Sequence, residues 1–148
     1  MRIYLACTVR GNRAGLEAAR TAAARLRALG HAVMTEHLLD DNVENAEAAL
    51  SERDVYDRDR RWLDECDAVV AEASGSTYGV GFEVGYITGR AEQTGQRVFV
   101  LFQESRRPAI SRLVSGFRSA NGLALGYRSL DEVEAFVNAH FGAAPAAT

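Results

Sequence analysis

Two acidic residues in different parts of the chain could act together as a catalytic pair. Glu83 follows a glycine- and hydroxyl-rich segment, Ser74–Gly81, and falls near the start of the helix that this segment introduces. The positive end of a helix favours an ionised carboxylate, so Glu83 could be a nucleophile, although first-turn glutamates are also common simply because they stabilise helices. Asp59 lies in a charged helical segment, four positions before Leu63, on the side that also carries apolar residues. Such a pair suits the cleavage of a glycosidic bond, in which one carboxylate attacks and a second acid protonates the leaving group.

The segment before Glu83 and the turn after the first apolar segment could bind an anion. Glycine lets backbone N–H groups approach a ligand closely, and the hydroxyl groups of Ser76 and Thr77 add donors. Arg10 and Gly11 follow the first apolar segment, and an arginine there could hold a phosphate through paired charged hydrogen bonds. A plain turn with helix-capping hydroxyl groups and a surface arginine fits the same residues, so both interpretations stay open.

Composition argues against several other kinds of function. The 148 residues include 17 basic and 20 acidic side chains, and all 17 are arginine, which rules out chemistry that needs a lysine. No basic tract is present, so we expect no nucleic-acid partner. Cys7, Cys66 and three scattered histidines predict no metal site. The start of the chain does not look like a leader and no apolar stretch approaches about 18 residues, so we expect a cytoplasmic protein without a membrane span.

Short apolar segments alternate with amphipathic ones, which is the pattern of a parallel sheet joined by helical crossovers. The expected strands cover residues 3–7, 32–35, 67–72, 97–102 and 122–127. The expected helices cover residues 14–29, 44–65 with a break near Ser51, 80–92 and about 129–141. The sequence thus predicts a single doubly wound α/β domain over residues 1–141, flavodoxin-like or Rossmann-like, with a five-stranded parallel sheet sandwiched by helices and a flexible tail over 142–148. Ligands bind beyond the carboxyl ends of such strands, where the candidate residues lie.

Several motifs occur in a fixed order along the chain. They are Tyr4–Gly11, Thr35–His37, Asp59–Leu63, Asp67–Glu72, Gly79–Gly85, Leu101–Phe102 and Ser111. In this order they resemble the nucleoside 2-deoxyribosyltransferase superfamily, and specifically its Rcl-like branch, the 2'-deoxynucleoside 5'-monophosphate N-glycosidases. The G-x-G-[FY]-E-x-G segment around Glu83 is the most specific of them, and the likeness extends from about residue 2 to residue 118.

This resemblance implies hydrolysis, with retained configuration, of the bond between the base and C1' of the deoxyribose. Glu83 matches the nucleophile that forms a covalent sugar ester, Asp59 matches the acid that assists the departing base, and Tyr4 matches a tyrosine that positions the nucleophile and the sugar. The positions that match substrate-binding residues are Thr8, Val9, Arg10, Gly11, His37, Ser76, Thr77, Gly79, Gly81 and Ser111. The resemblance also implies a homodimer in which Ser111 completes the phosphate site of the neighbouring subunit, while the role of His37 stays open.

The chemistry of such an enzyme sets further expectations. Retaining glycosidases hold their two carboxyl groups about 5–5.5 Å apart, so one of them must carry a proton. The helix start at Glu83 and a more enclosed Asp59 would place that proton on Asp59. A carboxylate stabilises the cationic transition state directly, so we expect no metal and no cofactor.

Some positions depart from the family pattern, and other functions stay open. Cys7 stands where a small residue, often glycine, lies against the substrate, and Thr77 replaces a serine. The alternatives are a deoxyribosyltransferase, which passes the sugar to a second base, a ribonucleotide N-glycosidase of the CMP-cleaving kind, and a non-catalytic nucleotide-binding domain. The phosphate-binding positions argue against the transferase, whereas base preference, pathway and the choice between deoxyribose and ribose are not decided by the sequence.

Overall fold

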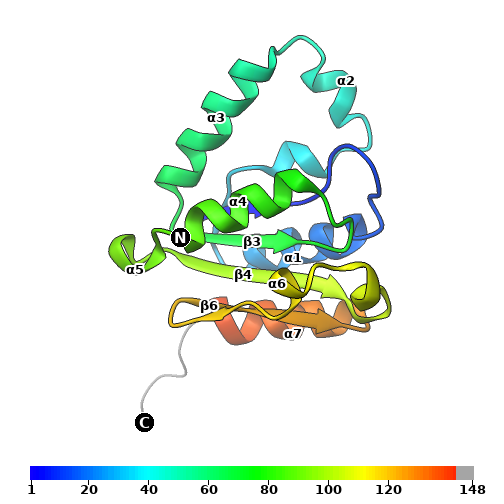
Figure 1. The fold of residues 1–148 in the computed structure, drawn as a ribbon, viewed down its shortest axis with the longest axis vertical. Coiled ribbons are helices and arrows are strands. Elements are labelled where there is room, and N and C mark those ends of the chain that lie inside the picture. Colours follow the sequence, from blue (N-terminus) through cyan, green and yellow to red (C-terminus); the bar gives the residue numbers. More distant parts are fainter. Residues whose placement is uncertain (143–148) are drawn as a thin grey trace.

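A six-stranded sheet between two layers of helices forms the centre of the computed structural model, which describes residues 1–142 (Figure 1). The strands are β1 (Arg2–Ala6), β2 (Ala32–Val33), β3 (Ala68–Glu72), β4 (Arg97–Gln103), β5 (Arg118–Ser119) and β6 (Gly122–Tyr127). Their order is β2-β1-β3-β4-β6-β5, in which neighbouring strands are parallel except for the antiparallel pair β5 and β6. The predicted doubly wound fold with five parallel strands is confirmed. The two-residue β5 is an additional edge strand, too short to show an alternating pattern in the sequence.

Helices cover both faces of the sheet. They are α1 (Leu16–Ala28), α2 (Val43–Glu47), α3 (Glu52–Glu65), α4 (Tyr78–Thr88), α5 (Ala91–Thr94), α6 (Arg112–Ser115) and α7 (Leu130–Phe141), with the 3-10 segments η1 (Glu36–Leu39) and η2 (Glu104–Ala109). Apolar side chains of α1 and α7 pack on one face, and those of α3 and α4 pack on the other (Figure 1). Successive side chains of a strand point to opposite faces. Ile3 and Leu5 therefore join the first cluster, whereas Tyr4 and Ala6 join the second, on the α4 side.

Two local features explain where neighbouring elements begin and end. The predicted break near Ser51 is confirmed, because Ser51 caps α3 by accepting a hydrogen bond from the N–H of Asp54 (3.2 Å). The second strand ends at Val33, two residues earlier than expected. The hydroxyl of Thr35 donates to the carbonyl oxygen of Leu5 (2.6 Å) and accepts from its N–H (2.9 Å), so it replaces the backbone bonds of the ladder there.

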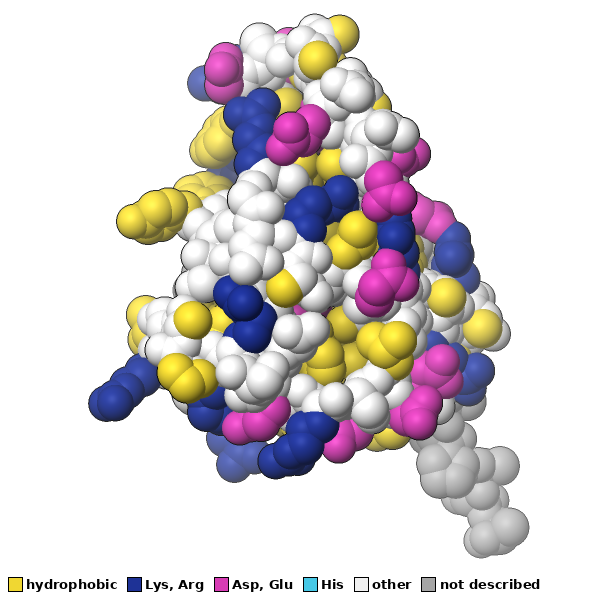
Figure 2. Space-filling view, turned by 90° about the vertical axis from the view of Figure 1, so that its right-hand side faces the viewer, with side chains coloured by type: hydrophobic (Ala, Val, Ile, Leu, Met, Phe, Trp, Pro, Cys, Tyr) yellow, Lys and Arg dark blue, Asp and Glu magenta, His cyan; other side chains and the backbone are white. Residues whose placement is uncertain are grey.

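The carboxyl ends of β1 and β3 form the topological switch point of the sheet. The two strands are neighbours, with Ile3 paired to Ala68, yet the helix after β1 covers one face and the helix after β3 covers the other. The connections that follow them lead to helices on opposite faces of the sheet, and this arrangement creates the crevice where ligands bind in sheets of this kind. Figure 2 looks onto this edge, over which arginine, acidic and hydrophobic side chains are interspersed.

Two remaining expectations concern the tail and the membrane. The tail predicted over residues 142–148 lies, from residue 143 onward, outside the described residues. Within residues 1–142, no helix has the length and apolar character needed to cross a membrane.

Candidate active site

A cleft of about 410 Å³ opens beyond the carboxyl ends of β1 and β3. Asp59 from α3 and Glu83 from α4 both line it, although they belong to different helices. Val9 and Arg10, from the loop after β1, and Thr77 and Gly79, from the start of α4, line the same cleft. The structure therefore brings together the two carboxylates and part of the predicted anion-binding segment.

Tyr4 orients the carboxylate of Glu83 through a hydrogen bond. Its side chain is fully buried, and its hydroxyl donates a hydrogen bond to Oε1 of Glu83 (2.6 Å). Burial, together with the negative charges of Glu83 and Asp59, raises the pKa of Tyr4 far above its ordinary value. The phenol therefore stays protonated and remains a hydrogen-bond donor, which leaves the other oxygen of Glu83 to face a ligand.

Glu83 is not the pre-ionised carboxylate that the sequence suggested. The single helix expected over 80–92 is divided into α4 and α5, and α4 already begins at Tyr78, so Glu83 lies in the second turn, where the helix dipole has little effect. The pKa of Glu83 is raised to about 7 overall, because burial and the charge of Asp59 raise it by more than the hydrogen bond from Tyr4 lowers it. In the free protein Glu83 is consequently about half protonated at neutral pH.

Asp59 is ion-paired instead of enclosed. Nε of Arg58 donates to Oδ1 of Asp59 (2.8 Å), and the Asp59 side chain is 23% exposed. Nη2 of Arg58 donates to Oε1 of Glu47 (2.7 Å), which also lies 3.3 Å from Nε2 of His37. The Asp59 carboxyl group therefore has an arginine partner that was not expected from the sequence.

Sequence reasoning missed Arg58 and Glu47, which both line the cleft. Arg58 belongs to the charged helical segment from which only Asp59 was singled out. The available signal was Trp62, four positions later on α3, because the guanidinium carbon of Arg58 lies 5.0 Å from the centre of that ring. Glu47 is separated from Arg58 by the whole connection between α2 and α3, so no local spacing revealed the pair.

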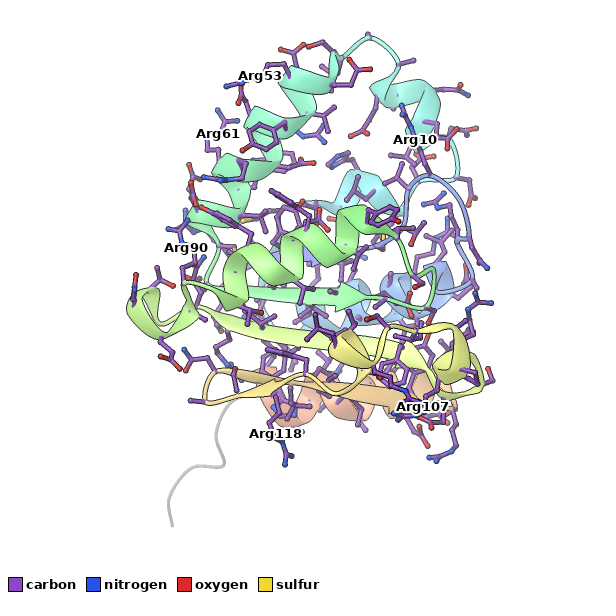
Figure 3. All side chains as sticks on the ribbon, in the orientation of Figure 1. Arg10, Arg53, Arg61, Arg90, Arg107 and Arg118 are labelled. Atoms are coloured by element: carbon purple, nitrogen blue, oxygen red, sulfur yellow. The ribbon has the colours of Figure 1, made fainter. Side chains whose placement is uncertain are left out.

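The two predicted anion-binding loops touch one another at the end of β1. Thr8 is buried, and its hydroxyl oxygen lies 3.4 Å from that of Thr77. Gly75 is required at this contact, because a Cβ atom there would lie 2.2 Å from Oγ1 of Thr8. Gly11 has φ +102°, a left-handed conformation that favours glycine, and Arg10 beside it is exposed (Figure 3).

A further arginine that the sequence did not single out fixes the loop after β1. Nε of Arg13 donates to the carbonyl oxygen of Thr8 (3.1 Å), and Nη2 donates to that of Leu38 (2.7 Å). The loop is therefore tied to η1, which stabilises the position of the residues between Thr8 and Arg13.

Six of the predicted binding residues do not line the first cleft, and two of these, Thr8 and Gly11, lie beside it in the loop after β1. Ser76, Gly81 and Ser111 line a second cavity of about 530 Å³ on another side of α4, which shares only Thr77 and Val80 with the first. His37 does not line the first cleft: it lies behind Glu47, with its ring edge-on to Trp62 at a centroid distance of 5.5 Å.

The described residues form no metal-binding cluster. Within residues 1–142, no group of three or more His, Cys, Asp or Glu side chains is placed to hold a metal ion. Cys7 lines the cleft as a free thiol, and burial raises its pKa to about 11, so it stays a neutral side chain there.

The sequence matches the family described as nucleoside 2-deoxyribosyltransferase over residues 3–136, which is most of the chain. The chain belongs to this family. A protein of Thermofilum pendens named putative 2'-deoxynucleoside 5'-phosphate N-hydrolase 1 is 35% identical over 132 residues, covering 89% of each chain. The human 5-hydroxymethyl-dUMP N-hydrolase is 30% identical over 145 residues, covering 97% of this chain and 80% of the human one. The resemblance stated from the motifs is thus confirmed.

A solved structure supports the fold. The CMP N-glycosidase of Clostridium botulinum superimposes with a TM-score of 0.67 at 17% identity, and the match covers 95% of this chain and all of that one. At this identity the likeness concerns the architecture alone.

Proposed function

We propose that this protein hydrolyses the N-glycosidic bond of 2'-deoxynucleoside 5'-monophosphates and releases the free base and 2-deoxyribose 5-phosphate. The observation that carries the proposal is that Asp59 and Glu83, from separate helices, line one cleft together with Arg10 and Thr77. The names of the Thermofilum and human relatives, which are N-hydrolases of deoxynucleotides, support the same reaction class.

The residues of the cleft suggest a retaining mechanism in two steps. Ionised Glu83, oriented by Tyr4, attacks C1' with one carboxylate oxygen while the bond pair between C1' and the base moves onto the base. Asp59 acts as the acid that gives its proton to the departing base, and its carboxylate then takes a proton back from the water that attacks C1' and releases Glu83. No metal or other cofactor takes part in either step.

The anion end of the cleft explains the choice of a phosphorylated substrate. Arg10, followed by Gly11 in the loop after β1, can place its guanidinium on the 5'-phosphate, with Thr77 and Gly79 offering donors in the same cleft. A nucleoside without phosphate would leave these donors unpaired, and this argues against a deoxyribosyltransferase that uses unphosphorylated nucleosides.

The second cavity supports a homodimer. It is bordered by Tyr78, which is fully exposed, and by Phe82, which is 53% exposed, and Leu113 nearby on α6 is 87% exposed. Exposed apolar side chains gathered in one place mark an interaction surface. Ser111 faces this cavity and not the cleft of its own subunit. We therefore assign Ser111 to the phosphate site of a neighbouring subunit, and place the enzyme in the cytoplasm, where its free thiols stay reduced.

The decisive experiment scores the release of free base from a panel of deoxyribo- and ribonucleoside monophosphates. Wild type should release base from deoxynucleotides, and Glu83→Gln should lower the rate by about 10³-fold or more while nucleotide binding persists. Glu92→Gln, an exposed glutamate on α5, is the matched control and should leave the rate unchanged. Full turnover by Glu83→Gln would contradict the catalytic assignment, and base exchange without sugar phosphate would indicate a transferase.

A further inference from the structure

The α3 side of the cleft is where the base of a bound nucleotide must lie. Arg10, Thr77 and Gly79 take the phosphate in the proposed function, and Glu83 takes C1', so the base extends toward the remaining walls. Those walls include Leu50, Val55 and Tyr56, which offer apolar and aromatic surface to a planar ring.

Among the described residues of this wall, Arg58 is a cation that lies beside three carboxylates. Asp59, Glu47 and Glu52 line the wall together with Arg58. Arg58 is held by its bonds to Asp59 and Glu47 and by the ring of Trp62, and its side chain is only 17% exposed. Within residues 1–142 its Nη1 atom makes no hydrogen bond, so the N–H groups there can serve a ligand. Arg53 and Arg61, by contrast, lie on the outer side of α3 (Figure 3).

Because Arg58 is bonded to Asp59, its guanidinium lies close to the expected position of the base. Its Nε atom touches the carboxylate that assists the departing base, and a guanidinium is a planar fork suited to carbonyl oxygens and delocalised anions. We propose that Arg58 is a further catalytic residue, which contacts the carbonyl oxygens of a 2-oxopyrimidine and stabilises the negative charge that this base acquires as it leaves. The inference rests on the proposed hydrolase function and names the class of base that the site favours.

The electron balance of the reaction explains why a fixed cation matters most for pyrimidines. When the bond between C1' and N1 breaks, its electron pair moves to N1 and spreads onto the carbonyl oxygens of the base, while Glu83 forms the new bond to C1'. A guanidinium stays protonated, so Arg58 stabilises this charge without giving up a proton. Asp59 then gives its proton to the base anion and recovers one from the attacking water in the second step. Purines can be protonated on a ring nitrogen before they leave, so they depend less on Arg58.

The neighbouring carboxylates increase the loss of rate expected when the positive charge of Arg58 is removed. Without Arg58, the departing anion would face Asp59, Glu47 and Glu52 with no compensating charge in that wall. A neutral substitute such as glutamine should therefore slow pyrimidine release through kcat, because the charge develops only in the transition state.

The test compares kcat and KM for dUMP, dCMP, dAMP, dGMP and 5-fluoro-dUMP in wild type, Arg58→Gln and Arg58→Lys. Arg58→Gln should lower kcat for dUMP about 100-fold, as for loss of one oxyanion donor, and kcat for the purine nucleotides several-fold at most. The loss should be smaller for 5-fluoro-dUMP than for dUMP, because fluorine already stabilises the leaving anion. Arg61→Gln, an exposed arginine of the same helix outside the cleft, should change none of these ratios.

The outcomes separate this inference from the proposed function. An equal loss for all five substrates, or no loss, would overturn the role of Arg58 while leaving the hydrolase intact. If Arg58→Gln does not fold, Arg58→Lys provides the test. A lysine ammonium cannot form the paired hydrogen bonds of a guanidinium, so kcat for dUMP should fall selectively, by about tenfold. Equal losses of kcat for purine and pyrimidine nucleotides would again overturn the role of Arg58. A wild-type protein that releases no base from any nucleotide would refute the hydrolase itself, and with it the inference.

Discussion

Replacing Tyr4 by phenylalanine should move the pH dependence of turnover to higher pH. The hydroxyl of Tyr4 donates a 2.6 Å hydrogen bond to Glu83 and so lowers the pKa of this carboxyl, which is about 7 with the bond present because burial and the charge of Asp59 raise it. A hydrogen bond to a charged group contributes about 1.5–3 kcal/mol, and one pKa unit corresponds to about 1.36 kcal/mol. Phenylalanine keeps the buried ring and removes the donor, so the pKa of Glu83 should rise by about 1–2 units.

The sign of the effect follows from the role of Glu83. A nucleophile attacks only when ionised, so kcat/KM for base release should fall as the pH drops through the pKa of Glu83, near 7 in wild type. In Tyr4→Phe this acidic limb should lie about 1–2 pH units higher. Ionisation of the substrate phosphate affects both pH profiles equally, so it does not contribute to the difference between the two proteins.

A second tyrosine on the helix of Glu83 provides the control. Tyr86 donates its hydroxyl to Asp64 and not to Glu83, so Tyr86→Phe should leave the acidic limb where it is. If the limb of Tyr4→Phe coincides with that of wild type, the hydrogen bond does not set the ionisation of Glu83, and the reasoning fails.

Two further changes test the site through stability and binding. At pH 8 the free energy of unfolding should be up to about 3 kcal/mol higher for Glu83→Gln than for wild type. The pKa of the Glu83 carboxyl is raised from 4.5 to about 7, so its ionisation destabilises the folded wild-type protein above pH 4.5. Urea denaturation should show the difference shrinking to zero below about pH 4, and equal stability at pH 8 would contradict the raised pKa. Gly75→Ala should weaken nucleotide binding in calorimetry, because the added methyl group collides with Thr8 and with the carbonyl oxygen of Asn12. Gly85→Ala, where the methyl group meets open space, is its control, and equal affinity of the two variants would show that this loop contact does not shape the anion site.

The sheet and the placement of Tyr4 could be predicted because they depend on strong local patterns. The buried strands β1 and β3 are continuous apolar segments, and alternation along β1 places Tyr4 on the face opposite to Ile3 and Leu5. Once these strands are neighbours, the loops after them must meet, as Thr8 and Thr77 do.

The charge state of the site could not be predicted, for two physical reasons. Gly79 and Gly81 are poor helix formers, so they obscured the start of α4 at Tyr78 and made Glu83 look like a first-turn residue. The bond between Arg58 and Glu47 joins elements that are distant in sequence, and only the folded arrangement of α2 and α3 brings them together.

The wall proposed to receive the base comes partly from a short helix and the connection that follows it. Glu47 ends the five-residue helix α2, and Leu50 lies in the connection to α3, outside both helical layers of the sheet. Surface connections of this kind accept insertions and exchanges far more readily than strands or packed helices do. On the assignment proposed above, substitutions and insertions within residues 43–51 can therefore change which base is preferred. The residues proposed to break the bond, Tyr4, Asp59 and Glu83, lie outside this segment and can stay the same.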